Sequence, residues 1–177
     1  MKNHKEVVMA GKAAFASGVV EMLKEDHAKV KELFEEFESA DSQEQAEIAA
    51  TAIFELEIHA ELEEKLIYPA IREVIDDSDM MNEAIEEHHL VHVLITELKK
   101  LKPKDEKFHA KFTVLSELVK HHIEEEEGEM LPEAERHDID WDVLEAAVMK
   151  RKEALMAKSS KKSPMKSKTA TKSSRRG

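Results

Sequence analysis

The chain has 177 residues, enough for one domain with a sizeable core, and it contains no cysteine, which excludes disulfides and thiolate metal sites. Residues 158–177 carry eight Lys or Arg and no Asp or Glu, and removing this +8 from the overall −12 leaves −20 on residues 1–157. Such an acidic body excludes direct nucleic-acid binding, whereas the basic tail is compatible with weak, non-specific contact. No apolar run approaches the roughly 20 residues that span a bilayer, and a signal-peptide pattern is lacking, so we expect a cytoplasmic protein without a membrane partner.

The first predicted helix begins at Gly18, after an arm at residues 1–17 that we expect to be loosely ordered. Only four Gly and four Pro occur in the chain, which favours long helices throughout. Steps of three and four residues place one face of this helix on a single stripe. The stripe contains Leu23, His27, Val30, Phe34 and Phe37.

Three further helices follow at short intervals. The second starts from an N-cap at Asp41 or Ser42 and runs to about Ile75, with Pro69 expected to kink it or to end its regular part. The third follows a turn at 76–78 and fades near 102–103. The fourth runs from about residue 105 past Pro132, and a shorter amphipathic helix then precedes the tail.

Four helices with short connections predict an all-α, up-down-up-down four-helix bundle over residues 18–157, followed by a disordered basic tail at 158–177. The chain also repeats itself: His59 is followed by two Glu and a Pro at the same spacings as His122. The dipeptide Asp26-His27 similarly corresponds to Glu87-His88. Two helical hairpins related by approximate internal duplication are the simplest account of this pattern.

Polar residues occupy positions where this bundle should have its core. A buried His or Glu without a partner costs several kcal/mol, yet seven of them fall on the four apolar stripes at matching levels. A single such residue would be explained by a core hydrogen bond, but seven on all four helices predict a metal site. The predicted ligands are His27, His59, Glu63, His88, His92, His122 and Glu126.

The number of these ligands indicates a pair of ions. Five His and two carboxylates exceed the four ligands of a structural zinc site. If Glu63 and Glu126 bridge together with a solvent oxygen, the ion bound by His88, His92 and His122 has six ligands. The ion bound by His27 and His59 then has five, which leaves one position for a small molecule such as dioxygen. Ligand type alone does not choose between iron, zinc, manganese and copper.

The spacing of these seven residues resembles that of the hemerythrin family in its bacterial HHE cation-binding form. The segments EEKLIYPAI and EEGEMLPEA, which follow the second and fourth helix sites, also resemble that family, and the match covers roughly residues 19–135. The resemblance implies an oxo- or hydroxo-bridged centre of two iron ions. In animal oxygen carriers of the family the fourth-helix carboxylate lies five residues after the His, which corresponds to Glu127. Internal symmetry with Glu63 favours Glu126, and Glu129 is a candidate for an extra ligand or a proton relay.

Other polar and aromatic residues receive weaker assignments. His89 and His121 lie about 100° around the helix from the predicted ligands, so we expect them to face solvent or to support a ligand. Tyr68 and Trp141 are assigned to packing. Three functions remain open: binding of dioxygen or nitric oxide for storage, delivery or sensing; enzymatic turnover of peroxide or nitric oxide in stress defence; and iron storage or buffering.

Overall fold

The computed structural model describes residues 18–76 and 78–162, so the expected N-terminal arm and most of the expected basic tail lie outside the described residues. The first helical hairpin consists of α1 (Gly18–Ser39), α2 (Ser42–Leu62), η1 (Glu63–Ile67) and α3 (Tyr68–Arg72). The second consists of α4 (Ser78–Leu98), α5 (Glu106–Glu125), η2 (Glu126–Met130) and α6 (Leu131–Ala134). The last element is α7 (Trp141–Lys162).

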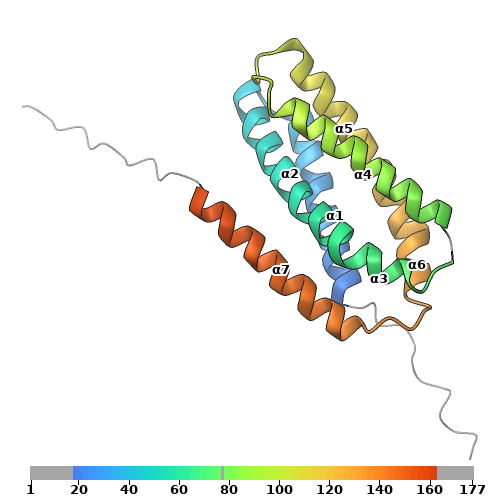
Figure 1. Ribbon diagram of the computed structural model, residues 1–177. Helices are drawn as coiled ribbons and strands as arrows, with labels where there is room; N and C mark the ends of the chain where they lie inside the picture. The colour runs from blue at the N-terminus through green and yellow to red at the C-terminus, as the bar shows by residue number, and fades with distance from the viewer. Residues whose placement is uncertain (1–17, 77, 163–177) are drawn as a thin grey trace, which may run out of the picture.

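The predicted up-down-up-down bundle is confirmed (Figure 1). Helix α1 packs against α2, and α4 packs against α5, so each hairpin pairs its own helices; α1 also contacts α5 across the bundle. Helix α7 is as long as α1, at 22 residues, and packs outside the bundle against α1, α2 and η1. No strand occurs in residues 18–76 and 78–162.

A capping box starts α2. The Asp41 side chain accepts hydrogen bonds from the backbone N–H groups of Gln43 (2.8 Å) and Glu44 (3.1 Å), while the Glu44 side chain accepts one from the Asp41 N–H. These bonds satisfy N–H groups that the first turn of a helix leaves free. The two antiparallel helices therefore turn sharply between Ser39 and Ser42.

Both hairpins contain a five-residue π-helical segment just before a proline. Tyr68 N–H bonds to the carbonyl of Glu63, and Leu131 N–H bonds to that of Glu126, five residues earlier in each case. Proline has no N–H and disturbs the i to i−4 ladder, and the wider π turn accommodates this while the helix continues for another turn. Residues five apart then share a face, so that Tyr68 comes onto the side of Glu63.

The core consists of two apolar clusters with a polar layer between them. The cluster at one end of the bundle includes Leu23, Leu62 and Ile71 together with Leu144 and Val148 of α7. The cluster at the other end is built around phenylalanines of α1 and α5, with Phe37 and Phe112 packed 4.1 Å apart between ring centroids. None of the helices in the described part of the chain is long and apolar enough to cross a bilayer.

Candidate metal centre

The polar layer contains six of the seven ligands that the sequence predicts. They are contributed by all four bundle helices and the two π segments, and each is at most 7% exposed: His27, His59, Glu63, His88, His122 and Glu126. They form two groups in which one donor atom of each residue lies within 4.8 Å of the others, and Glu63 belongs to both groups. A shared carboxylate between two groups is the arrangement expected of a bridging ligand.

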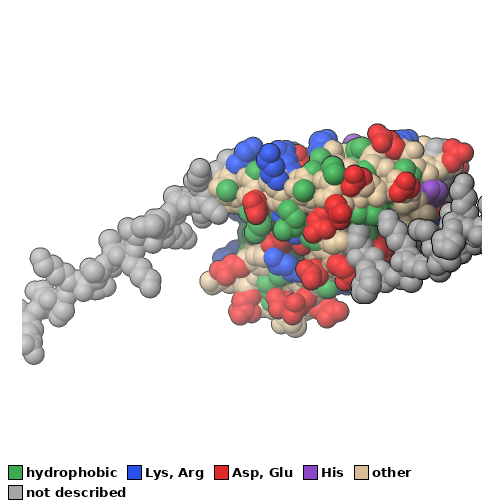
Figure 2. All heavy atoms as spheres, turned by 90° about the horizontal axis from the view of Figure 1, so that it is seen from below, with side chains coloured by type: hydrophobic (Ala, Val, Ile, Leu, Met, Phe, Trp, Pro, Cys, Tyr) green, Lys and Arg blue, Asp and Glu red, His purple; other side chains and the backbone are tan. Residues whose placement is uncertain are grey.

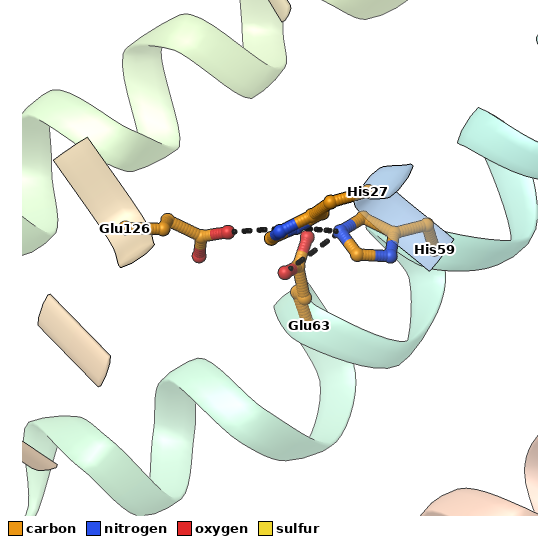
Figure 3. Close-up of side chains that lie close together, drawn as sticks. All are labelled: His27, His59, Glu63 and Glu126. Carbon is orange, nitrogen blue, oxygen red and sulfur yellow. Dashed lines mark hydrogen bonds and ion pairs between the residues drawn. The ribbon is translucent and has the colours of Figure 1, made fainter. Parts of the chain in front are cut away.

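The first group joins His27, His59, Glu63 and Glu126 (Figure 3). The Nε2 atoms of His27 and His59 lie 3.1 Å apart, and His59 Nε2 lies 3.0 Å from Glu63 Oε1. Glu126 Oε2 approaches His27 Nε2 from the opposite hairpin at 3.4 Å. Two imidazole nitrogens and two carboxylates therefore point at one small volume.

The second group joins His88, His122 and Glu63, with Glu126 at its edge. The Nε2 atoms of His88 and His122 are again 3.1 Å apart, and Glu63 Oε2 lies 3.4 Å from His88 Nε2. The Tyr68 hydroxyl donates to Glu126 Oε1 at 2.8 Å and lies 3.1 Å and 3.2 Å from the two Nε2 atoms. Tyr68 is therefore a fifth oxygen or nitrogen donor in this half.

An outer ring of carboxylates lies against the Nδ1 atoms of the same histidines. His27 Nδ1 donates to Glu127 at 2.8 Å, His88 Nδ1 to Glu64 at 3.1 Å and His122 Nδ1 to Glu87 at 2.7 Å. Asp26 Oδ2 lies 3.7 Å from His59 Nδ1. An ionised carboxylate only accepts hydrogen bonds, so a neutral ring bonded in this way carries its proton on Nδ1 and turns a bare Nε2 lone pair towards the centre.

This outer ring follows the internal duplication of the chain. Glu64 and Glu127 occupy equivalent positions after the second and fourth helix sites, and each bonds a His of the other hairpin. Asp26 and Glu87 each precede a His in sequence and face the other His of the same hairpin. The repeat therefore specifies the supporting shell as well as the inner residues.

The electrostatics of the layer favour positive charge inside it. Burial lowers the pKa of His59, but Glu63, Asp26 and Glu126 outweigh that effect and raise it to about 10. Burial raises the pKa of Glu63, yet His59 and His88 hold it well below its ordinary value. Burial, Glu63 and Glu126 raise the pKa of Tyr68 well above its ordinary value. Without a metal, a proton on His59 therefore offsets part of the negative charge of the buried carboxylates.

The residues fit a pair of metal ions better than they fit hydrogen bonding alone. Both Glu63 oxygens and Glu126 Oε2 are buried without a hydrogen-bond partner in the described residues. Unpaired buried carboxylate oxygens beside inward-facing imidazole nitrogens are costly unless a cation binds them. Glu63 and Glu126 would bridge the two ions, with His27 and His59 on one and His88, His122 and Tyr68 on the other.

A narrow cavity adjoins the four imidazoles on the side of the phenylalanine cluster. Apart from the histidines and Asp26, its walls are aliphatic, and they come from all four bundle helices: Val30, Leu56, Ala60, Val91, Val119 and Ile123. A space of this kind admits a small, weakly polar molecule next to the metal positions. A large or strongly hydrated ligand would lose its hydration there without gaining polar partners.

His92, the seventh predicted ligand, is not brought to the centre. Its side chain is 44% exposed, and its Nε2 lies 2.7 Å from Glu64 Oε1. One helical turn beyond His88 on α4, it reaches only the outer carboxylate. Lys31 occupies the equivalent place in the first half, 3.7 Å from Glu127.

The structure separates the other candidate ligands and supporting residues that the sequence left open. Glu126 lies at the centre and Glu127 lies on His27, so that the two candidates for the fourth-helix carboxylate occupy different shells. Glu129 is exposed and outside both groups, and His89 is also exposed. His121 is exposed as well, but it lies 3.7 Å from Glu87 and 3.3 Å from Glu125.

Tyr68 is the residue whose position the sequence reasoning missed. A regular helix would turn residue 68 away from the stripe of Glu63, and helical spacing alone therefore does not predict Tyr68 at the centre. The π turn restores the alignment of residues five apart. The signal was available in the proline at position 69, because a proline inside a continuing helix requires a local change of helical pitch.

Comparisons with known proteins identify the family and the fold. A family model described as Hemerythrin HHE cation binding domain matches residues 18–134. The crystal structure of an HHE cation-binding domain-containing protein from Mycobacterium kansasii superposes with a TM-score of 0.67 at 21% identity, covering 84% of this chain and 94% of that one. A curated protein of Nostoc sp., named DNA nickase, is 29% identical over 111 residues, 62% of this chain. The match spans 31% of that relative's length.

Proposed function

The chain belongs to the hemerythrin HHE cation-binding domain family, and from that premise we propose that its centre holds two iron ions and binds dioxygen or nitric oxide. The observation that carries the proposal is the inward turn of four Nε2 atoms in two pairs, each 3.1 Å apart, around the shared carboxylate of Glu63 and the neighbouring carboxylate of Glu126. Bound iron would supply a redox-active centre with a coordination position for a diatomic ligand. The chain's own residues hold the ions, fix the imidazole tautomers and exclude water.

The choice of iron rests on the donor set. Imidazole, carboxylate and phenol oxygen are ligands that ferric and ferrous ions accept, and the seven donors exceed what one zinc ion binds in a structural site. The absence of cysteine removes the thiolates that would favour zinc or copper(I). Manganese satisfies the same preferences, so metal analysis and reconstitution provide the test between the two.

The two ions would have different numbers of protein ligands, and this difference indicates where the small ligand would bind. His88, His122 and Tyr68 serve one ion in addition to the bridging carboxylates, whereas only His27 and His59 serve the other. The less saturated ion is the one at which a ligand would bind from the aliphatic cavity. Binding for storage, delivery or sensing follows most directly from such a site.

Turnover of peroxide or nitric oxide is the second candidate, and Tyr68 is the residue that favours it. Its oxygen lies 2.8 Å from Glu126 inside the centre, and a phenol beside the ions is a redox-active group that simple ligand binding does not require. Loss of peroxide turnover in Tyr68→Phe, with the metal retained, would support this candidate over simple binding. Iron storage has no comparable feature in its favour.

A cavity-filling variant tests the ligand site. Ala60 lines the cavity, and Ala60→Leu should retain both ions while weakening dioxygen or nitric oxide binding about 10-fold or more. Ala52→Leu is the matched control, because Ala52 is equally buried in α2 but does not line the cavity. Unchanged ligand affinity in Ala60→Leu, with metal content as in the parent, would show that the ligand does not bind in this cavity.

We also propose that the basic segment at 158–177 makes weak, non-specific contact with nucleic acid. The support is its eight positive charges beside an acidic body, whose Asp and Glu side chains spread over the face in Figure 2, and the name of the Nostoc relative. Binding to duplex DNA should fall with salt at a log–log slope of up to roughly −7 for eight phosphate contacts. Binding that survives deletion of 158–177, or that ignores salt, would contradict the proposal.

A further inference from the structure

Helix α7 makes its main helix–helix contacts with one half of the centre's framework. It packs against α1, α2 and η1, the elements that carry His27, His59 and Glu63. Its apolar face buries Leu144 and Val148 in the nearby core cluster, and Arg151 pairs with Glu61. Helix α7 is therefore fixed on the side of the ion that His27 and His59 would bind.

One side chain of α7 reaches the outer ring of carboxylates. Lys152 Nζ lies 2.7 Å from Asp26 Oδ1 and 2.6 Å from Oδ2, and both side chains are at most 20% exposed. Asp26 Oδ2, in turn, is 3.7 Å from His59 Nδ1. A chain of charges thus runs from α7 through Asp26 to an imidazole of the centre.

Within residues 18–76 and 78–162, no Lys or Arg from outside the four-helix bundle pairs with the corresponding carboxylate of the other half. Glu87, the counterpart of Asp26, accepts directly from His122 Nδ1 at 2.7 Å. The basic side chain beside it is the exposed His121 of α5, whose Nε2 lies 3.7 Å from Glu87 Oε1. Asp26 stands farther from its histidine than Glu87 does, and it is held there by a residue 126 positions later in the chain. The internal duplication is therefore broken at the carboxylates that support the centre, as it is at Tyr68, whose counterpart in the second half is Leu131.

We propose that Lys152 is a positioning residue for His59 and determines how firmly the first ion is held. This inference rests on the proposed metal pair. Lys152 holds the Asp26 carboxylate on the Nδ1 side of His59, at 3.7 Å, beyond hydrogen-bond distance. The negative charge of Asp26 at that position favours the ring orientation in which Nδ1–H faces Asp26 and Nε2 faces Glu63. Without the ammonium group, the partly buried Asp26 turns to water and His59 loses its outer partner.

The test compares chelator-driven metal release in Lys152→Met, Lys152→Arg and Arg151→Met. Lys152→Met should release one of the two ions about 10- to 100-fold faster than the parent, the range typical of lost outer-shell partners, while the second ion leaves at the parent rate. Mössbauer spectra should show the change in one of the two iron signals. Lys152→Arg should restore the parent rate, because a guanidinium group also binds a carboxylate with two bonds.

Two controls separate this route from general damage. Arg151→Met removes the neighbouring anchor of α7 without touching Asp26, and Lys29→Met removes the Lys29–Glu55 ion pair, 2.7 Å long, between α1 and α2. Both should leave the two release rates unchanged. Equal acceleration in Arg151→Met and Lys152→Met, or parent-like release in Lys152→Met, would overturn the positioning role.

A metal-free readout keeps this proposal distinguishable from the proposed function. In the metal-free protein, the His59 ring signals in nitrogen-15 NMR should shift in Lys152→Met and return in Lys152→Arg. A parent that never holds two ions, with that shift still present, would refute the metal pair and leave the positioning of His59 standing. Two ions in the parent and no shift in the variant would refute the positioning alone.

Discussion

The carboxylate of Glu64 connects His92 to His88. Glu64 Oε1 is 2.7 Å from His92 Nε2 and 3.1 Å from His88 Nδ1, so a single oxygen connects a partly exposed histidine to a buried one. A histidine in that place supports the orientation of Glu64. It does not present a nitrogen to the interior, because its side chain is 44% exposed.

Replacing His92 should therefore affect the centre far less than replacing His88. We expect His92→Leu to retain two ions per chain, with less than about a 10-fold loss in affinity, since Glu64 still binds His88. His88→Leu removes an inner donor and should lose at least one ion. Metal content after gel filtration in a weak chelator measures both. Loss of an ion in His92→Leu would instead make His92 an inner ligand and require a different conformation of α4.

Tyr68 should be visible by spectroscopy, because it is the only tyrosine in the chain. Its hydroxyl lies 3.1 Å and 3.2 Å from the Nε2 atoms of His88 and His122, within reach of an ion bound there. In the ferric protein we expect a phenolate-to-iron charge-transfer band in the visible range, which Tyr68→Phe abolishes while two ions remain. A visible band that persists in Tyr68→Phe would show that the phenol does not bind the metal.

Most of the inner layer was predictable because it obeys regular helical spacing. Each bundle helix has one histidine that interrupts its apolar stripe at the level where the four antiparallel helices meet: His27, His59, His88 and His122. Glu63 lies four residues after His59, and Glu126 lies four residues after His122. Position relative to a single helix is enough to identify such residues. The bundle itself follows from the same periodicity and from the short connections.

The positions of the Tyr68 and His92 side chains could not be predicted from helical spacing alone. The π segment before Pro69 changes the pitch, so that residue 68 turns inward although a regular helix would place it elsewhere. On α4, i+4 spacing puts His92 on the face of His88 but one turn farther along, level with Glu64. The internal duplication indicated that position 92 is not an inner ligand, because its counterpart is Lys31, and a protonated lysine does not bind a metal.

Metal should stabilise the fold, because without it Glu63 Oε2 and Glu126 Oε2 are buried with no hydrogen-bond partner in the described residues. Binding to the native state alone adds about 4 kcal/mol when the free metal exceeds its dissociation constant 1,000-fold. Thermal unfolding of metal-free and reconstituted protein should therefore give a clearly higher midpoint for the latter. Equal midpoints would contradict a buried site, and Glu63→Gln offers a variant in which the difference should shrink.

The metal-free protein should lose stability as the pH rises through the alkaline range. The pKa of His59 is raised to about 10 in the folded chain, so the folded state binds more protons than the unfolded one above pH 6.5. The groups facing His59 are Glu63, Asp26, Glu126 and His27. The stabilisation is complete below pH 6.5 and disappears as the pH approaches 10, which urea unfolding at several pH values would measure. His59→Gln should flatten this dependence.

The same protonation opposes metal binding. The ion bound by His27 and His59 must displace the proton from His59 before Nε2 can act as a donor, so the apparent affinity for that ion should increase between pH 6 and pH 9. Competition with a chelator of known pH dependence measures this increase. An affinity that is constant over that range would indicate that His59 is already neutral in the metal-free protein.

The most direct test of the metal pair is the metal content of the full-length protein reconstituted with ferrous iron under nitrogen, exposed to air and freed of loosely bound metal. We expect about two iron ions per chain and near-ultraviolet charge-transfer absorption, and we expect the double variant His59→Leu with His122→Leu to hold neither. One zinc ion per chain, with no iron retained, would contradict the account.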